Sequence, residues 1–281
     1  MDFLRKLLNP FGKNKKRKFQ DLSKESKKVS SNPPSELLLC SRDIAGLQIQ
    51  QHMNLLNDCR WIRAEYTFPA FDSMNFIYKN KVFSIIIDIQ DYSGNSYLPD
   101  TYVKRQLLAA KEHNLIPCKF PVVVDNPHNP NLNTAKALNK GWNLYNTETN
   151  ENIIPEHLAT TENIKMSEWE KRNFAVIFVR KYLEAKRLKV LSYQDTMEVD
   201  PQMWFEDENN KKCWIVIRCS KFPESEPPKP DNLKEIIRRC FSYDGYYTNI
   251  ILKSLSDDNE LYRNGSVKID FKGLEKIHSV I

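Results

Sequence analysis

The sequence predicts an α/β protein with mixed sheets, in which one α-β-β-β-α-β unit occurs twice in tandem. Six elements follow each other in the same order in two stretches that lie about 130 residues apart. The apolar runs SIIIDI and WIVIR, one in each stretch, are typical of strands buried on both faces. We therefore expect a leader and linker at 1–35, a first repeat at 36–160 and a second repeat at 161–281.

The leader is basic and differs from the rest of the chain. Residues 1–30 hold ten Lys or Arg against three Asp or Glu, whereas the other 251 residues hold 32 basic and 33 acidic side chains. The near balance of the folded part argues against a dedicated nucleic-acid-binding protein. The run at 19–35, rich in Ser, Lys, Asn and Pro, is typical of a flexible linker.

One hypothesis for the leader is a helix that lies on a membrane surface. Apolar residues at helical spacing within 3–11 precede a basic run, and such a segment binds anionic lipid through its apolar face and its charges. The lipid or anion contacts would be Lys13, Lys15, Lys16, Arg17 and Lys18. The other interpretation is a solvated leader that contacts nothing or a partner, because two helical turns bury little area.

Each repeat opens with a helix and a short strand. Helical spacing of apolar residues begins at Ala45 in the first repeat (AGLQIQQHMNLL) and at Ala175 in the second (AVIFVRKYLEAK). Runs with strand composition follow at 61–68 and 189–193.

The centre of each repeat is a hairpin preceded by an aspartate. Asp72 is followed four residues later by Phe76, and Asp200 is followed at the same interval by Trp204. Each aromatic lies in or beside a pair of strands joined by a polar turn, NFIY-KNK-VFSIIIDIQ or WFED-ENNK-KCWIVIRCS. The second strand of each pair is expected at the centre of its sheet.

A Pro-Asp pair starts the second helix of each repeat. Pro99-Asp100 precedes TYVKRQLLAAKEHN, and Pro230-Asp231 precedes NLKEIIRRCF. Each helix leads to a further strand, PVVVD or NIILK, so the chain crosses over to a fourth strand. The runs WNLYNTETNENI and ELYRNGSVKIDF then predict a small terminal hairpin in each repeat.

The order of elements and the residues in them resemble the core of the PD-(D/E)XK nuclease-like superfamily, over residues 45–125 and 175–254. The resemblance implies a restriction-endonuclease-like topology and Mg- or Mn-dependent cleavage of DNA or RNA, in which carboxylates hold the metal. It assigns Asp72 and Asp88 as metal ligands and places Gln90 where the family has a lysine. Residues 88 and 90 share one side of a strand, as i and i+2 do. The second repeat has RCS at the matching place, so no metal site is expected there.

The same residues also have a structural explanation. An aspartate before a strand, such as Asp72, commonly forms a turn through its carboxylate. A carboxylate at the end of an apolar run, such as Asp88, needs a partner if it is buried. The first repeat has one carboxylate pair without the motif lysine, and the second repeat is degenerate. We therefore predict a non-catalytic binding protein that uses no cofactor and whose partner is another protein.

Two alternative functions stand beside this prediction. The first is a nuclease that acts on nucleic acid with Mg or Mn at Asp72 and Asp88 and with Gln90 as the third catalytic group. The second is a peripheral membrane protein that is anchored through residues 1–18.

The stretch FSYDGYYTN is the candidate surface for a protein partner. Its Asp-Gly turn is surrounded by aromatic residues, and Tyr243, Tyr246 and Tyr247 would be the contacts because tyrosines at a loop tip suit protein binding. The alternative interpretation is that these rings pack inside the protein between a helix and a strand.

Other kinds of site lack a pattern in the sequence. The five histidines have no paired metal-ligand spacing, the six cysteines form no CxxC motif, and no phosphate-binding glycine motif occurs. No apolar run is long enough to cross a membrane, and the first residues do not resemble a cleavable secretory signal. We therefore expect reduced thiols and a cytoplasmic protein.

Overall fold

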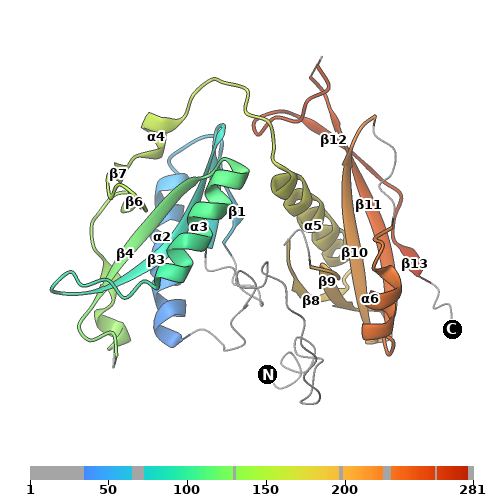
Figure 1. The fold of residues 1–281 in the computed structure, drawn as a ribbon, viewed down its shortest axis with the longest axis horizontal. Coiled ribbons are helices and arrows are strands. Elements are labelled where there is room, and N and C mark those ends of the chain that lie inside the picture. Colours follow the sequence, from blue (N-terminus) through green and yellow to red (C-terminus); the bar gives the residue numbers. More distant parts are fainter. Residues whose placement is uncertain are drawn as a thin grey trace, which may run out of the picture.

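The computed structural model describes residues 35–64, 73–128, 131–195, 199–223, 229–256 and 258–277. These residues form an α/β protein with two mixed sheets, each flanked by helices, which confirms the predicted fold class (Figure 1). The basic residues of the leader and Asp72 lie outside the described ranges. None of the described helices combines the length and the apolarity that crossing a bilayer requires.

The first half contains, in chain order, α2 (Glu36–Met53), β1 (Cys59–Arg63), β2 (Ser73–Tyr78), β3 (Lys81–Asp91), α3 (Asp100–His113), β4 (Ile116–Val124), the 3-10 helix η2 (Leu132–Thr134), β5 (Lys136–Ala137), β6 (Leu144–Asn146), β7 (Asn152–Ile153) and α4 (Pro155–Leu158). Its sheet has the order β1-β2-β3-β4-β6-β7, and β5 pairs with β4 beside this path. Strands β3 and β4 are parallel, whereas their other pairings are antiparallel. Helices α2 and α3 lie on opposite faces of this sheet (Figure 1).

The second half contains α5 (Glu168–Ala185), β8 (Lys189–Tyr193), β9 (Met203–Glu206), β10 (Lys212–Lys221), α6 (Leu233–Arg239), β11 (Asp244–Ser254), β12 (Val267–Phe271) and β13 (Glu275–Ile277). Its sheet has the order β12-β11-β10-β9-β8, and β13 pairs with β11. Strands β10 and β11 are parallel. Helices α5 and α6 lie on opposite faces of this sheet (Figure 1).

The two halves share the order α-β-β-β-α-β in their first six elements and one central parallel strand pair each. They differ after it, because β6 and β7 form the predicted terminal hairpin, whereas β12 and β13 both pair with β11 and not with each other. In both, a hairpin is followed by a helix that crosses over to the parallel strand, as the sequence pattern predicted. The origin of both halves in one duplicated unit stays a prediction.

The strand ladders shift one of the sequence matches by one residue. Phe76 lies two residues after the buried Met74, and Phe205 lies two residues after the buried Met203. Each methionine pairs with an isoleucine of the central strand. The structural counterpart of Phe76 is therefore Phe205 and not Trp204, because the strand face, rather than the interval to an aspartate, decides which side chain enters the core.

Each sheet buries alternate side chains under its helices. Between α2 and the first sheet, Phe76 stacks on Phe83 and on Trp142, with ring centroids 4.7 and 5.6 Å apart. The second sheet has a core on each face, and Trp214 fills the one under α6. The indole leaves no room at Gly245 of the neighbouring strand, where an added Cβ would lie 2.2 Å from Cζ2 of Trp214.

The halves meet through buried polar contacts. Nη1 of Arg63, at the end of β1, lies 2.9 Å from Oδ1 of Asp195 in the second half, and both side chains are buried. Arg263 pairs with Glu170 of α5 and also donates from Nη2 to the backbone oxygen of His113, at the end of α3. These contacts join charged groups that would be costly to bury alone, so they fix how the halves sit together.

Candidate functional site

Asp88 is fully buried on β3, on the sheet face opposite α2, and its carboxylate is surrounded by partners. The hydroxyl of Ser96 donates to Oδ1 at 2.5 Å, and Nε2 of Gln90 donates to Oδ2 at 2.7 Å. Nζ of Lys119 lies 3.8 Å from Oδ2. Asp88 and Gln90 thus lie on one side of the strand, as their spacing predicted, and the carboxylate has the partner that its burial requires.

The turn after β3 closes the site. Oδ1 of Asp91 accepts hydrogen bonds from the backbone N–H groups of Ser93 and Asn95, and this carboxylate organises the turn. The hydrogen bonds from Asn95 hold the pKa of Asp91 below its ordinary value. The chain then returns along β3, where Ser96 pairs with Gln90. The turn therefore places the Ser96 hydroxyl on Asp88.

Lys119 comes from the neighbouring strand β4. It is the parallel partner of Ile86, and its neighbours Cys118 and Phe120 point into the core under α2. Because side chains alternate along a strand, Lys119 projects to the face that holds Asp88. Sequence reasoning missed this residue because the pairing of β3 with β4 is not encoded in local spacing. The apolar alternation of β4 was the available signal.

In this conformation both oxygens of the buried Asp88 carboxylate accept hydrogen bonds that a metal ion would compete with. Hard divalent cations bind oxygen ligands and need room for water or substrate. Both oxygens of Asp88 are already engaged, and its side chain has no exposed surface. Within the described ranges, no group of three or more His, Cys, Asp or Glu side chains is placed to hold a metal. The predicted pairing of Asp88 with Asp72 lies outside those ranges.

The matching strand position of the second half carries the opposite charge. Asp88 lies three residues after Ile85, and Arg218 lies three residues after Ile215, the two isoleucines that occupy equivalent ladder positions. Arg218 forms two parallel hydrogen bonds to Asp200, at 2.8 and 2.9 Å. The carboxylate of Asp200 is thus occupied by a guanidinium.

A small network surrounds this ion pair. Burial alone would raise the pKa of Asp200, but hydrogen bonds from Arg218 and Gln202 hold it below its ordinary value. Arg172 of α5 lies close enough to add its charge, and its Nη1 is buried without a hydrogen-bond partner among the described residues. Burial first, and then the charge of Arg218, lowers the pKa of the Arg172 guanidinium. The network has two aspartates near Arg172, Asp200 and Asp195, and serves packing and charge balance.

Of the three tyrosines predicted to contact a partner, Tyr247 is buried and Tyr243 and Tyr246 are half-buried. Tyr247 is 5% exposed and packs with Trp214 under α6, while Tyr243 forms an edge contact with Trp204. Tyr246 packs on the other face of the sheet, beside Phe205. These rings lie on β11 or just before it, where successive residues alternate between two packed faces. Tyr247 is therefore buried in the core under α6, and the role of the three tyrosines as partner contacts stays a prediction.

The exposed aromatic of this stretch is Phe241, which follows α6. Its side chain is 82% exposed, the largest value among the large apolar residues of the described chain. The two preceding residues on the helix, Arg238 and Arg239, are exposed as well. The prediction of a partner surface here stays a prediction, and Phe241 is the residue that would carry it.

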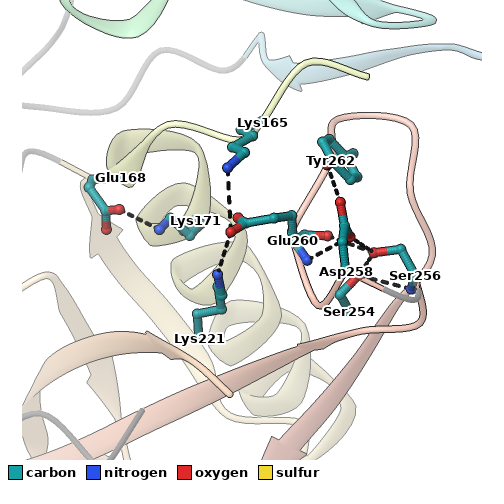
Figure 2. Close-up of polar contacts among 9 residues, drawn as sticks. All are labelled: Lys165, Glu168, Lys171, Lys221, Ser254, Ser256, Asp258, Glu260 and Tyr262. Carbon is teal, nitrogen blue, oxygen red and sulfur yellow. Dashed lines mark hydrogen bonds and ion pairs between the residues drawn. The ribbon is translucent and has the colours of Figure 1, made fainter. Parts of the chain in front are cut away.

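A second polar cluster holds the loop between β11 and β12 (Figure 2). Asp258 accepts hydrogen bonds from Ser256, from the backbone N–H of Glu260 and from Tyr262. The hydrogen bond from Tyr262 is the largest of the effects that lower the pKa of Asp258 to about 2. Glu260 is shared by two lysines, with Lys221 at 3.1 Å. All of these bonds are internal to the loop and its neighbours, so the cluster is explained by loop structure.

The six cysteines, all of which lie in the described ranges, form no disulfide bond in the structure. Burial raises the pKa of Cys213 to about 11 and that of Cys240 to about 11. Such thiols stay protonated near neutral pH, which makes them poor nucleophiles.

Comparison with known proteins gives one match. A family model described as "Domain of unknown function (DUF8840)" matches residues 169–277, from α5 to β13. No curated protein and no solved structure matches the chain. The match covers the second half alone, and its description names no activity.

Proposed function

We propose that the protein is a non-catalytic binding protein and that its partner is another protein. The observation that carries this proposal is the set of contacts made at one strand position in each half. It is the position at which the nucleases that the sequence resembles hold their metal. Asp88 accepts a hydrogen bond from Ser96 and lies beside the amine of Lys119. In the second half, Arg218 forms an ion pair with Asp200. Two different charge pairs at one position, the first with a buried carboxylate and the second half-buried, suit a structural role better than catalysis, which needs an accessible ligand set.

A cleavage assay tests this proposal. The full chain is incubated with single- and double-stranded DNA and RNA in the presence of Mg or Mn, beside the variants Asp88→Asn and Asp270→Asn. Asp270 is an exposed aspartate of β12 and serves as the matched control. We expect no metal-dependent cleavage by any of the three proteins. Cleavage that is lost in Asp88→Asn but kept in Asp270→Asn would overturn the proposal.

A metal-dependent nuclease is the second candidate, and one contact favours it. Lys119 brings an amine to within 3.8 Å of Asp88, beside Gln90, and so supplies from the neighbouring strand the group that the motif lacks. This function requires that Ser96 leave Asp88 when metal binds. In that case Lys119→Met would abolish cleavage and Ser96→Ala would leave it intact or raise it.

A further inference from the structure

We propose that a groove beside α3 binds an acidic amphipathic helix of a partner protein. The groove has a volume of about 700 Å³, which is within the usual range for binding sites. Leu107 and Leu108 lie along it, with Lys104 one turn before them and Lys111 one turn after them. This proposal rests on the proposed function and specifies the chemistry of the partner.

Apart from Ala110, the residues by which α3 borders the groove are not among the buried residues of the helix. Gln106 and Ala110 are its buried residues, whereas Lys104 and Lys111 are exposed and Leu108 is 65% exposed. An exposed leucine between two lysines gives the face an apolar centre with charged ends. A helix that binds in a groove places apolar anchors there, and these recur at i, i+3, i+4 and i+7 along the bound helix.

The walls of the groove are fixed before any ligand arrives. Nε2 of Gln106 donates to the backbone oxygens of Ser84 and Cys118, which ties α3 to the two central strands. Its Oε1 accepts a hydrogen bond from Thr147, whose backbone N–H donates to the oxygen of Pro117. Helix α3 and the turn that carries Thr147 therefore form two rigid walls. A preformed groove reduces the entropy cost of binding.

Charge selects among the candidate occupants. The leader carries ten basic residues against three acidic residues, so it has the wrong sign for Lys104 and Lys111. A second copy docked groove to groove would place these lysines against themselves. Nucleic acid would satisfy the lysines, which outnumber the one acidic lining residue, Glu148, but it would leave the exposed Leu108 without an apolar partner. An acidic helix with an apolar stripe satisfies the lysines and the leucines together.

Titration of a designed peptide tests the proposal. The probe is a labelled helical peptide with leucines along one stripe and glutamates beside them, and a second peptide has lysine in place of every glutamate. Fluorescence anisotropy is measured with the full chain, with Lys104→Glu/Lys111→Glu and with Leu108→Gln. The control Lys234→Glu makes the same charge change on α6 of the second half, where the lysine is also exposed.

We expect the acidic peptide to bind the native chain and the control alike. Its affinity should fall about tenfold in the double lysine variant and about tenfold in Leu108→Gln, while the lysine peptide should bind only the double variant. Because the three altered side chains are exposed, circular dichroism should show an unchanged fold, and amide shifts near Ala110 and Leu115 provide a second readout of peptide contact.

Several results would overturn the proposal that the groove binds an acidic helix. These are absence of binding by the acidic peptide, equal binding by both peptides, no effect of the groove variants, or displacement of the peptide by single-stranded DNA at equal charge. The cleavage assay is independent of these measurements. If the chain neither cleaves nucleic acid nor binds the peptide, the proposed function stands and the proposal for the groove is rejected. If the chain cleaves nucleic acid, the proposed function is rejected, whether or not the peptide binds.

Discussion

Replacement of Arg172 by Met removes a buried charge and is expected to raise the free energy of unfolding. Within the part of the chain that the structure describes, the Nη1 group of Arg172 is buried without a hydrogen-bond partner. A buried donor that lacks a hydrogen bond costs about 1–3 kcal/mol. Burial and the nearby charge of Arg218 both lower the pKa of this guanidinium, so the folded state disfavours its charged form. Met keeps an unbranched apolar stem, and we expect a gain of about 1–3 kcal/mol.

Replacement of Asp200 by Asn should have the opposite effect. It leaves Arg218 without its carboxylate partner and leaves Arg172 with Asp195 as its remaining nearby aspartate. Loss of one partner of a buried pair costs about 3–5 kcal/mol, and we expect the lower end because Arg218 is partly exposed. In the Arg172→Met background the loss should be smaller, because one fewer cation is left uncompensated.

Urea unfolding of the four proteins of this double-mutant cycle measures these values. Arg238→Met, on the exposed side of α6, is the control and should change the free energy of unfolding by less than about 0.5 kcal/mol. The reasoning is refuted if Arg172→Met lowers the free energy of unfolding by about 1 kcal/mol or more. It is also refuted if the cost of Asp200→Asn is the same in both backgrounds, because the two sites would then not share a charge balance.

Three further predictions follow from the structure and the sequence. The folded-state pKa of Asp200 lies below its ordinary value of 3.8. The contribution of its ionised carboxylate to the free energy of unfolding is therefore fully present above pH 3.8 and is lost as pH falls through the lower folded-state value. The cost of Asp200→Asn, measured by denaturant unfolding, should shrink over that window. Gly245→Ala should lower the free energy of unfolding by about 1–3 kcal/mol because its Cβ would overlap Trp214. Gly46→Ala on α2 has ordinary contact distances and should raise the free energy of unfolding by about 0.5–1 kcal/mol. Thermal unfolding of both variants distinguishes a packing clash from a general intolerance of alanine. Deletion of residues 1–18 should leave the circular dichroism of the body unchanged, and co-sedimentation with anionic vesicles, if it is a property of the leader, should be lost in the deletion variant and kept in the full chain.

The order of the elements could be predicted because it depends on short-range pattern. Apolar runs, polar turns and Pro-Asp starts each lie within a few residues of the element they define. The match of Phe76 with Trp204 as counterparts in the two repeats was wrong because it relied on the same kind of short-range pattern. An interval to an aspartate is a property of the chain, whereas entry into the core depends on the strand face, which only the ladder with the neighbouring strand determines.

The candidate site was predictable in part. The spacing of Asp88 and Gln90 placed them on one side of a strand, and the burial rule required a partner for the carboxylate. That partner comes from two places that spacing does not reveal. Lys119 depends on the crossover that sets β4 beside β3, and Ser96 depends on a turn that folds back over the strand end. Both are tertiary contacts between residues that the sequence separates.

The contact between Lys119 and Asp88 also sets a condition on the alternative function. At 3.8 Å and an effective dielectric constant of about 20, the attraction between the two charges is on the order of 4 kcal/mol. A metal ion at Asp88 would need to displace the hydrogen bond from Ser96 and would bring its charge close to the lysine. Metal binding and the closed turn therefore exclude each other. If the first half does bind Mg or Mn, the ion should weaken the protection of the Ser96 and Tyr97 amides in hydrogen exchange, and Ser96→Ala should tighten its binding. Unchanged protection together with tight metal binding would mean that Asp88 is not the ligand.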